Sequence, residues 1–463
     1  MVNVLLIMSD EHRRDAMGCM GHSVVKTPNL DRLAQNGSLF TSAYCNSPLC
    51  GPSRSSFITG KYVHEIGCWD QNHHYTGEPQ SWGAYLKEHR VSVTTVGKLD
   101  FFEGVEGGFS DQRLVKHRRK MQQQQVQVEA KLDHAAGKQA ARSFGSIELE
   151  RSGPGDYWTK SVEAETAAAL RFLRNEAPGK ETPWVLWLNY LPPHFPLVAP
   201  ASYYAMYPTE QIDMPYDHPT SDNHPVTAQL REHIGMNEVD EEMVRRARAA
   251  YYGLCSYIDD HIDKVLQALE EVGLIEDTLI IYTSDHGEHL GDHELWWKNH
   301  LYEQAAGIPL IISGGGVSRN IVNTPVSLLD LSATIVDAVG LPPFSVGRGR
   351  SLLPLCQGEY SKEWAERAVF SEYHGHGTTN SMYMIRKGKY KYIYYPNNPP
   401  QLFNLETDQR EMTNLAEQQS CRDIVQQLHS ELLNILDPDL VDEFVRRTCK
   451  SESSGSGEGS WLE

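Results

Sequence analysis

Val4-Leu5-Leu6-Ile7-Met8, followed by Ser9-Asp10-Glu11, is the most informative stretch of this sequence for the fold class. An unbroken apolar run of this kind predicts a strand that is buried on both faces. Similar runs recur along the chain, at 91–96, 184–191, 279–282 and 308–312. Amphipathic stretches at helical spacing lie between them. The alternation predicts an α/β fold, with a large mixed, mostly parallel sheet sandwiched by helices.

Polar residues follow several of these predicted strands at the point where each strand ends. They are Asp10, Lys98, His194 and Asp285. Open α/β sheets bind ligands at the carboxyl ends of their strands. We therefore expect these four side chains, which are far apart in the sequence, to meet at one edge of the sheet.

The pattern changes after about residue 365. Short strand-like runs at 383–385, 389–395 and 401–405 precede a helical stretch at 421–435, which predicts a smaller C-terminal antiparallel sheet packed by a helix. We divide the chain into a catalytic domain at 1–365, a subdomain at 366–450 and a disordered Ser/Gly-rich tail at 451–463. The polar, glutamine-rich segment 113–150 is interpreted as an inserted helical arm or, alternatively, as a solvated face.

Composition limits the partners and the compartment. The 463 residues carry a formal net charge of −19, which disfavours nucleic acid and anionic membranes as partners. No apolar run approaches the length of about 18 residues that a membrane span requires. The eight cysteines include no C-x-x-C pair, and no charged segment precedes Val4 as in a signal peptide. These features predict a cytoplasmic enzyme with free thiols.

The run Cys50-Gly51-Pro52-Ser53-Arg54 predicts a reactive position. Pro52 suits the first turn of a helix and Gly60 suits its end, so Cys50 would lie at the N-terminus, where free N–H groups favour an anion. Arg54 follows one turn later. From these residues alone, Cys50 is an inert buried thiol, a low-pKa thiolate of a Cys/His hydrolase, or a modified residue.

The Cys50 run, continued by Ser55-Ser56-Phe57-Ile58-Thr59-Gly60, resembles the signature of type I sulfatases of the alkaline phosphatase superfamily. In that family the cysteine is oxidised to formylglycine after synthesis. Further stretches match in the family's order; they are Ser9-Asp10-Glu11, Gly97-Lys98, Pro193-His194, Ser284-Asp285-His286, Trp297-Lys298-Asn299 and the C-terminal 401–408 and 411–415. The resemblance spans most of residues 1–415.

The resemblance implies a site for one divalent metal, with Asp10, Cys50, Asp285 and His286 as ligands. Glu11 departs from the second aspartate that the family commonly has, so its part in the site stays open. Oxygen ligands favour Ca²⁺, and an imidazole ligand makes Mn²⁺ the alternative. His289 and His293, four residues apart, are also compatible with a zinc pair on a helix.

The resemblance also implies catalytic roles. Hydrated formylglycine at residue 50 would be the nucleophile, favoured in its ionised form by the metal and Arg54. Lys98 and Lys298 would bind the transferred group, and His194 or Lys298 would protonate the leaving alcohol. Asp100 stands where many sulfatases have a histidine that helps to break the intermediate, so the base is Asp100 or another histidine.

Residues 67–75 are expected to touch the substrate. Some relatives place an asparagine about twenty residues after the nucleophile, and Gln71 or Asn72 could fill that place here. The aromatic residues Trp69 and Tyr75 either line the pocket or belong to the core.

The leading hypothesis is a sulfatase that hydrolyses aryl or alkyl sulfate monoesters. His286, at a position where many sulfatases have asparagine, resembles choline sulfatases and phosphonate monoester hydrolases, so a phosphonate monoester or phosphodiester hydrolase on the same site is the alternative. A non-catalytic metal- and anion-binding protein is a third hypothesis. The implied partners are a small-molecule ester and a formylglycine-generating enzyme, and the glutamine-rich segment hints at a homo-oligomer.

Overall fold

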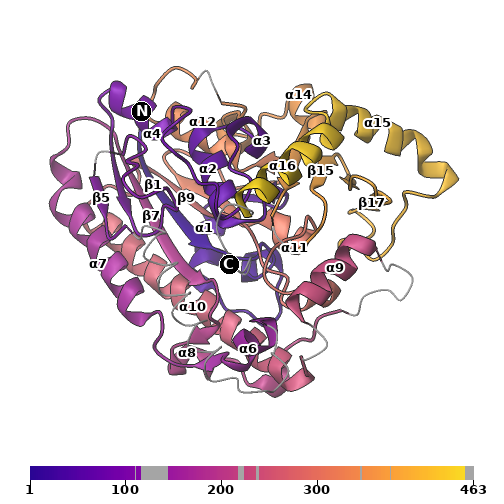
Figure 1. Ribbon diagram of the computed structural model, residues 1–463. Helices are drawn as coiled ribbons and strands as arrows, with labels where there is room; N and C mark the ends of the chain where they lie inside the picture. The colour runs from indigo at the N-terminus through magenta and orange to yellow at the C-terminus, as the bar shows by residue number, and fades with distance from the viewer. Residues whose placement is uncertain are drawn as a thin grey trace.

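In the computed structural model, a sheet of eight strands forms the centre of the fold (Figure 1). The structure describes residues 1–109, 111–115, 144–216, 224–235, 239–344, 347–375 and 377–453. The strand order is β12 (Asn320–Val322), β2 (Gly37–Phe40), β11 (Leu310–Gly314), β9 (Thr278–Ser284), β1 (Asn3–Asp10), β7 (Trp184–Pro193), β4 (Ser92–Val96), β5 (Asp111–Arg113). Only β11 runs antiparallel to its neighbours, which confirms the predicted mixed, mostly parallel sheet.

Helices cover both faces of this sheet because successive side chains of a strand point to opposite sides. From β1, Leu5 and Ile7 enter one apolar cluster, whereas Val4, Leu6 and Met8 enter another. The first face carries α1 (Pro28–Gln35), α7 (Thr159–Asn175) and α10 (Glu241–Glu271). The second carries α2 (Cys50–Thr59), α4 (Trp82–Glu88) and α12 (Leu329–Ala338). Figure 1 shows α7 and α10 on the opposite side of β1 and β7 from α2 and α12.

The central parallel strands bring their carboxyl ends to one edge. Asp10 ends β1, and Lys98, His194 and Asp285 follow β4, β7 and β9. These four strands are consecutive in the sheet, in the order β9-β1-β7-β4. The predicted meeting of the four side chains is confirmed by their contacts, which are described below.

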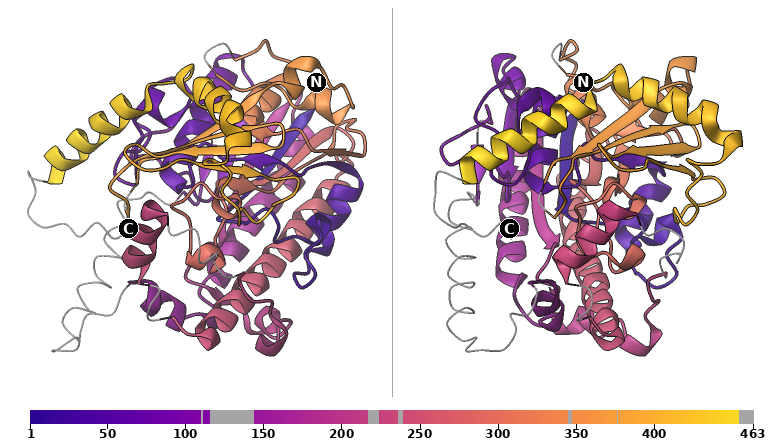
Figure 2. Two further views of the ribbon diagram at one scale, coloured as in Figure 1. Left: turned by 90° about the vertical axis from the view of Figure 1, so that its right-hand side faces the viewer. Right: turned by 45° about the vertical axis from the view of Figure 1, so that its right-hand side comes forward.

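The C-terminal part forms a second sheet, as predicted. Its four antiparallel strands are β14 (Ala368–Tyr373), β15 (Met382–Lys387), β16 (Tyr390–Tyr394) and β17 (Gln401–Asn404). Helix α15 (Arg422–Leu433) packs on it through Leu428 and Leu432. Figure 2 shows α15 and α16 (Pro438–Ser453) in yellow, beside the orange strands of this sheet. Neither β14 nor α16 was expected from the sequence, and the boundary at residue 365 stays a prediction.

The structure describes only part of the predicted arm and only part of the predicted tail. Of the segment 113–150, residues 116–143 lie outside the described residues, and Phe144–Glu150 form α6. Of the tail, residues 451–453 belong to α16, and 454–463 lie outside the described residues. Among the helices that the structure describes, none combines the length and apolar character needed to cross a membrane.

Short elements connect the two sheets and their helices. Three two-residue strands form a small sheet, β10 (Gly307–Ile308), β3 (Ala43–Tyr44) and β13 (Val326–Ser327), and β6 (Gly153–Pro154) pairs with β8 (Val198–Ala199). The shorter helices are α3 (Val63–Ile66), α8 (Ala201–Tyr204), α9 (Pro225–Ile234), α11 (Glu303–Ala306), α13 (Leu353–Cys356) and α14 (Lys362–Ala365).

A buried carboxylate ties the C-terminal sheet to the catalytic part. Glu372 of β14 accepts a hydrogen bond from the backbone N–H of His64 (3.0 Å), and its carboxylate lies 3.0 Å from His64 Nδ1 and 2.8 Å from His374 Nε2. Burial alone would raise the pKa of Glu372, but His64 and His374 lower it to about 2. A carboxyl group whose pKa falls on folding stabilises the folded state above its unfolded pKa, and this stabilisation is lost as the pH falls toward 2.

Replacing Glu372 by glutamine should therefore destabilise the protein at pH 7 by about 3 kcal/mol. The difference from wild type should shrink between about pH 4.5 and pH 2, because the wild-type carboxylate becomes protonated over that range. Denaturant unfolding at pH 7 and pH 3 measures the difference. The exposed Glu366→Gln variant is the control and should behave as wild type. An equal loss for Glu372→Gln at both pH values would contradict the electrostatic explanation.

Candidate active site

Cys50 begins helix α2 and is buried at the edge of the sheet, as the proline and glycine spacing predicted. Its Sγ atom lies 3.1 Å from His286 Nε2, 3.5 Å from Asp10 Oδ1 and 3.6 Å from Lys298 Nζ. Burial and Asp10 act to raise the pKa of the Cys50 thiol, yet Lys298, Lys98 and His286 together bring it well below its usual value. The side chain of residue 50 is therefore in a strongly polar environment.

Arg54 lies one turn after Cys50 and is fully buried. Its Nε donates to Asp285 Oδ2 (2.7 Å) and its Nη2 to Asp10 Oδ2 (3.2 Å). Its Nη1 donates to the Lys98 carbonyl (2.9 Å) and to Asn189 Oδ1 (2.8 Å). Arg54 thus holds the two aspartates in place. Asn189, on β7, was missed by the sequence reasoning because an asparagine within a strand gives no motif signal.

Four of the predicted side chains form a compact group that fits a metal cation. One ligand atom from each of Asp10, Cys50, Asp285 and His286 lies within 4.8 Å of the others, and all four residues are buried. The Nδ1–H of His286 donates to the Gly287 carbonyl (2.9 Å), so Nε2 is the ring nitrogen that faces the group. Burial favours the neutral ring, but Asp285 and Cys50 raise the pKa of His286 to about 9, so a metal would have to replace the Nε2 proton. Two carboxylates and an oriented imidazole suit a divalent ion.

The charges of this group are balanced by the surrounding cations. Burial alone would raise the pKa of Asp10, but Lys98, His194 and Arg54 lower it well below its usual value. Burial and the neighbouring Asp10 raise the pKa of Asp285. Two carboxylates this close in the interior repel each other, so additional positive charge at this point would be stabilising.

Two lysines face the same centre. Lys98 Nζ donates to Asp10 Oδ2 (2.7 Å) and lies 3.6 Å from the carboxylate of Asp100. Lys298 Nζ lies 2.9 Å from His194 Nε2. Although burial favours the neutral amine, Cys50 and Glu11 raise the pKa of Lys298 above its usual value. Both side chains therefore remain cationic and can bind an anionic group.

Glu11 lies beside this group of four and contacts different partners. Its Oε2 accepts from Lys298 Nζ (2.8 Å) and lies 3.2 Å from His194 Nε2. Together with Asp10 and His194 it forms a second group whose ligand atoms lie within 4.8 Å of one another. Burial raises the pKa of Glu11 to about 8, and the nearby Glu288 carboxylate acts in the same direction.

Of the two residues predicted to touch the substrate in the loop 67–75, Gln71 lies beside the start of α2 and Asn72 lies at the surface. Gln71 is buried, and its Oε1 accepts from the Gly51 N–H (3.3 Å), beside the nucleophile. Asn72 is exposed, and its backbone N–H donates to Asp70. Trp69 and Tyr75 are buried in apolar clusters, which favours the core for these two rings.

His74 lies against the start of α2, although no sequence motif pointed to it. A Cβ atom at Gly51 would lie 2.8 Å from His74 Cε1, so only glycine fits between this ring and the start of α2. Its Nδ1 donates to the Asp100 carbonyl (3.1 Å), and its Nε2 contacts the Gln71 carbonyl. The sequence could not single out His74 because the spacing of the loop around it matches no motif.

The zinc-pair hypothesis for His289 and His293 is wrong. The spacing of four brings side chains together only on an α-helix, and His293 has a left-handed backbone (φ 57°) within a short 3₁₀ turn, Asp292–Glu294. Neither histidine belongs to a group of metal-ligating side chains in the part of the chain that the structure describes.

Comparison with known proteins assigns the chain to a family. The sulfatase family model matches residues 2–341. The chain belongs to the sulfatase family. A second model, for the C-terminal region of N-sulphoglucosamine sulphohydrolase, matches residues 291–437. This sulfatase is 30% identical to arylsulfatase K of Danio rerio, over 97% of this chain and 86% of the relative.

Two further relatives come from bacteria. The sulfatase is 28% identical to a choline-sulfatase of Rhizobium meliloti, over 90% of this chain and 82% of the relative. Its structure resembles the phosphonate monoester hydrolase of Silicibacter pomeroyi with a TM-score of 0.77 and 26% identity, covering 95% and 97% of the two chains. Family membership makes the chain a sulfuric ester hydrolase, and the hypothesis of a non-catalytic anion-binding protein is wrong.

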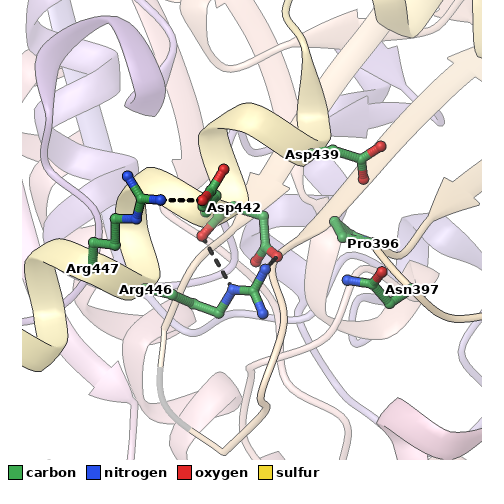
Figure 3. A pocket seen from close by; sticks show the side chains of 7 residues that line it. Pro396, Asn397, Asp439, Asp442, Arg446 and Arg447 are labelled. Atoms are coloured by element: carbon green, nitrogen blue, oxygen red, sulfur yellow. Dashed lines mark hydrogen bonds and ion pairs between the residues drawn. The ribbon is translucent and has the colours of Figure 1, made fainter.

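Two hollows on the described part of the sulfatase lie away from Cys50. One, of about 840 Å³, is lined by residues that include Arg13, Arg248 and Glu303. The other, of about 550 Å³, lies between α16 and the loop at Pro396 and Asn397 (Figure 3). Its arginines pair with acidic residues of the same helix. Neither hollow includes a residue that contacts Cys50 Sγ.

Proposed function

We propose that this sulfatase hydrolyses sulfate monoesters with a formylglycine made from Cys50. The observation that carries the proposal is the placement of Cys50 Sγ, buried at the start of α2 and within 3.6 Å of polar atoms of His286, Asp10 and Lys298. An aldehyde at this position would hydrate to two hydroxyl groups on one carbon. Lys98, Lys298 and the charge of Arg54 favour an ionised hydroxyl there.

In the first step, the ionised hydroxyl attacks sulfur, an O–S bond forms, and the S–O bond to the alcohol breaks. Lys98 and Lys298 stabilise the negative charge on the transferred group. The leaving oxygen takes a proton from the pair formed by Lys298 Nζ and His194 Nε2, which are 2.9 Å apart. The alcohol leaves, and the sulfate stays esterified to residue 50.

In the second step, the remaining hydroxyl on the same carbon gives up its proton. The C=O bond re-forms, the C–O bond to sulfate breaks, and the aldehyde is restored. Asp100, whose carboxylate lies 3.6 Å from Lys98 Nζ, is the candidate for the base. A serine or an unmodified thiolate lacks the second hydroxyl and would need an external water to release its ester, which explains why the modification is useful.

The residues also fit one divalent metal. Asp10, Asp285, His286 and the side chain of residue 50 would hold it, with Ca²⁺ favoured by the carboxylate oxygens and Mn²⁺ by the imidazole. When bound, the ion would supply positive charge beside the transferred group and the nucleophile.

Phosphonate monoester hydrolysis is the second candidate function. It is supported by the two phosphonate monoester hydrolases among the similar structures, at 25% and 26% identity. A sulfate monoester and a phosphonate monoester both present a tetrahedral centre with one negative charge, so the same cations can bind either. Sulfate is favoured because the family model and the arylsulfatase K and choline-sulfatase relatives all point to sulfate esters.

Maturation would require the formylglycine-generating enzyme before folding is complete. Every residue of α2 is buried in the folded chain, so the Cys50-Gly51-Pro52-Ser53-Arg54 run is accessible only in an unfolded segment. The cytoplasmic location, the domain boundaries and a homo-oligomer remain predictions from the sequence.

Mass spectrometry and matched substrates test this proposal. The peptide that contains Cys50 should be lighter than the thiol form by roughly 18 Da in active enzyme. The value of kcat/KM should be higher for 4-nitrophenyl sulfate than for 4-nitrophenyl phenylphosphonate. A thiol-only peptide in active enzyme would refute the formylglycine step, and a preference of about tenfold or more for the phosphonate would reverse the assignment of the substrate.

A further inference from the structure

We propose that Glu11 is a positioning residue, which holds Lys298 and His194 for protonation of the leaving group, and that it is not a metal ligand. The inference rests on the proposed function, because it assigns a part in the release of the alcohol. It concerns the position at which the sequence departs from the paired aspartates of the family.

The contacts of the Glu11 carboxylate support this role. Its Oε2 is 2.8 Å from Lys298 Nζ and 3.2 Å from His194 Nε2, and the side chain is fully buried. The group of Asp10, Cys50, Asp285 and His286 does not include Glu11. In the second group, with Asp10 and His194, Glu11 Oε2 is paired with the Lys298 ammonium, whereas its Oε1 is buried without a hydrogen-bond partner among the described residues. A cation placed against Oε2 would have to displace the Lys298 ammonium from it.

The backbone of Glu11 fixes the direction of its side chain. The residue has φ 65°, a left-handed conformation that is uncommon for a residue other than glycine. Its N–H donates to Asp285 Oδ1 (3.2 Å), and its carbonyl accepts from the Tyr251 hydroxyl (2.7 Å). Asp10 and Glu11 are therefore adjacent in sequence but direct their carboxylates to different partners.

Lys298 connects Glu11 to the reacting centre. Its ammonium group has three N–H bonds and three neighbours, namely Cys50 Sγ, His194 Nε2 and Glu11 Oε2. His194 donates its Nδ1–H to the Phe195 carbonyl (2.6 Å), so its Nε2 is the ring nitrogen that faces Lys298 Nζ (2.9 Å). With Glu11 in place, Lys298 is held between the nucleophile and His194. Without it, the amine loses one of its three acceptors and its orientation.

A second glutamate holds the loop that carries Lys298. Glu288 Oε1 accepts from the backbone N–H of Leu290 (2.9 Å) and of Trp297, the residue before Lys298. Phe195 adds to the arrangement because its ring stacks on His194 and lies 5.1 Å from Lys298 Nζ. Lys298 and His194 are thus held by several neighbours, and Glu11 Oε2 is the contact that they share.

The test compares Glu11→Leu, which removes the acceptor, with Glu11→Gln, which keeps a side-chain carbonyl oxygen. Rates are measured on a series of aryl sulfates with leaving phenols of increasing pKa. Glu11→Leu should lose about 100-fold in kcat/KM on the poorest leaving groups and less than about tenfold on the best, because only poor leaving groups need the proton. Glu11→Gln should lose less than about tenfold across the series.

Two further measurements separate positioning from metal binding. The Ca²⁺ and Mn²⁺ contents of the purified variants should equal those of wild type, as should the formylglycine content at residue 50. A loss of metal in either variant, with an equal rate loss on all leaving groups, would overturn the proposal. If Glu11→Leu does not fold, Glu11→Gln decides by its metal content. Absence of formylglycine in wild type would refute the proposed function, whereas the leaving-group dependence would still test Glu11.

Discussion

Replacing Cys50 by alanine is expected to reduce kcat/KM by about 10⁴-fold or more, because removal of a nucleophile leaves only the binding contribution of the remaining site. Cys50→Ser should be similarly inactive in turnover. Serine carries one hydroxyl, so it lacks the second oxygen that expels sulfate. Steady-state rates on 4-nitrophenyl sulfate and mass spectrometry of the protein after exposure to substrate measure both effects.

Cys255→Ala is the matched control for this experiment. Cys255 is also fully buried with a free thiol, but it lies in α10, within the apolar cluster on the other face of the sheet. Its replacement should leave kcat/KM within a few fold of the wild-type value and should lower the stability of the fold only modestly. Circular dichroism and thermal unfolding should show that the Cys50 variants retain the fold. Activity retained in Cys50→Ala would place the chemistry on another residue.

Replacing Asp285 by asparagine is expected to remove the bound metal and to lower kcat/KM by about 10³-fold or more. Asp285 Oδ2 accepts from Arg54 Nε (2.7 Å), and its Oδ1 accepts from the N–H of Glu11 and of His286. An amide keeps much of the shape but removes one of the two negative charges that attract a cation. Metal analysis of the purified protein and rates with added Ca²⁺ or Mn²⁺ measure the effect.

Asp259→Asn controls for the general cost of changing a buried aspartate. Asp259 is equally buried, but its carboxylate accepts from the backbone N–H groups of Asn29 and Leu30 at the start of α1. Its replacement should lower stability and leave metal content unchanged. If Asp285→Asn kept full metal occupancy and lost activity only in proportion to its stability, the group around Asp10 would not be the metal site.

Most of the fold could be predicted from local pattern. The apolar run at Val4–Met8 is buried on both faces, as its composition indicated, and Pro52 and Gly60 mark the start and end of α2. These features depend on the hydrophobicity and the backbone preference of the residues, which are set by residue type. Strand β14 and helix α16 were missed because the apolar run of β14 is short and α16 shows only a short apolar stripe.

The site was predicted less completely. Asp10, Lys98, His194 and Asp285 meet because parallel strands share one edge, a consequence of topology that the sequence pattern allowed us to infer. The zinc pair predicted from the spacing of His289 and His293 was wrong because that spacing places side chains together only on a helix, and the chain forms a short turn there instead. His74 and Asn189 carry no motif, so only their distances to the start of α2 and to Arg54 reveal them.

The sequence by itself determined the fold class, the family resemblance and the identity of the residue at the start of α2, because these follow from residue type and order. Only the tertiary structure decided which side chains share a contact. Asp10 and Glu11 are adjacent and both acidic, yet one faces Cys50 and Arg54 while the other faces Lys298 and His194. The difference comes from a left-handed backbone at Glu11, which is held by Asp285 and Tyr251, residues far away in the chain.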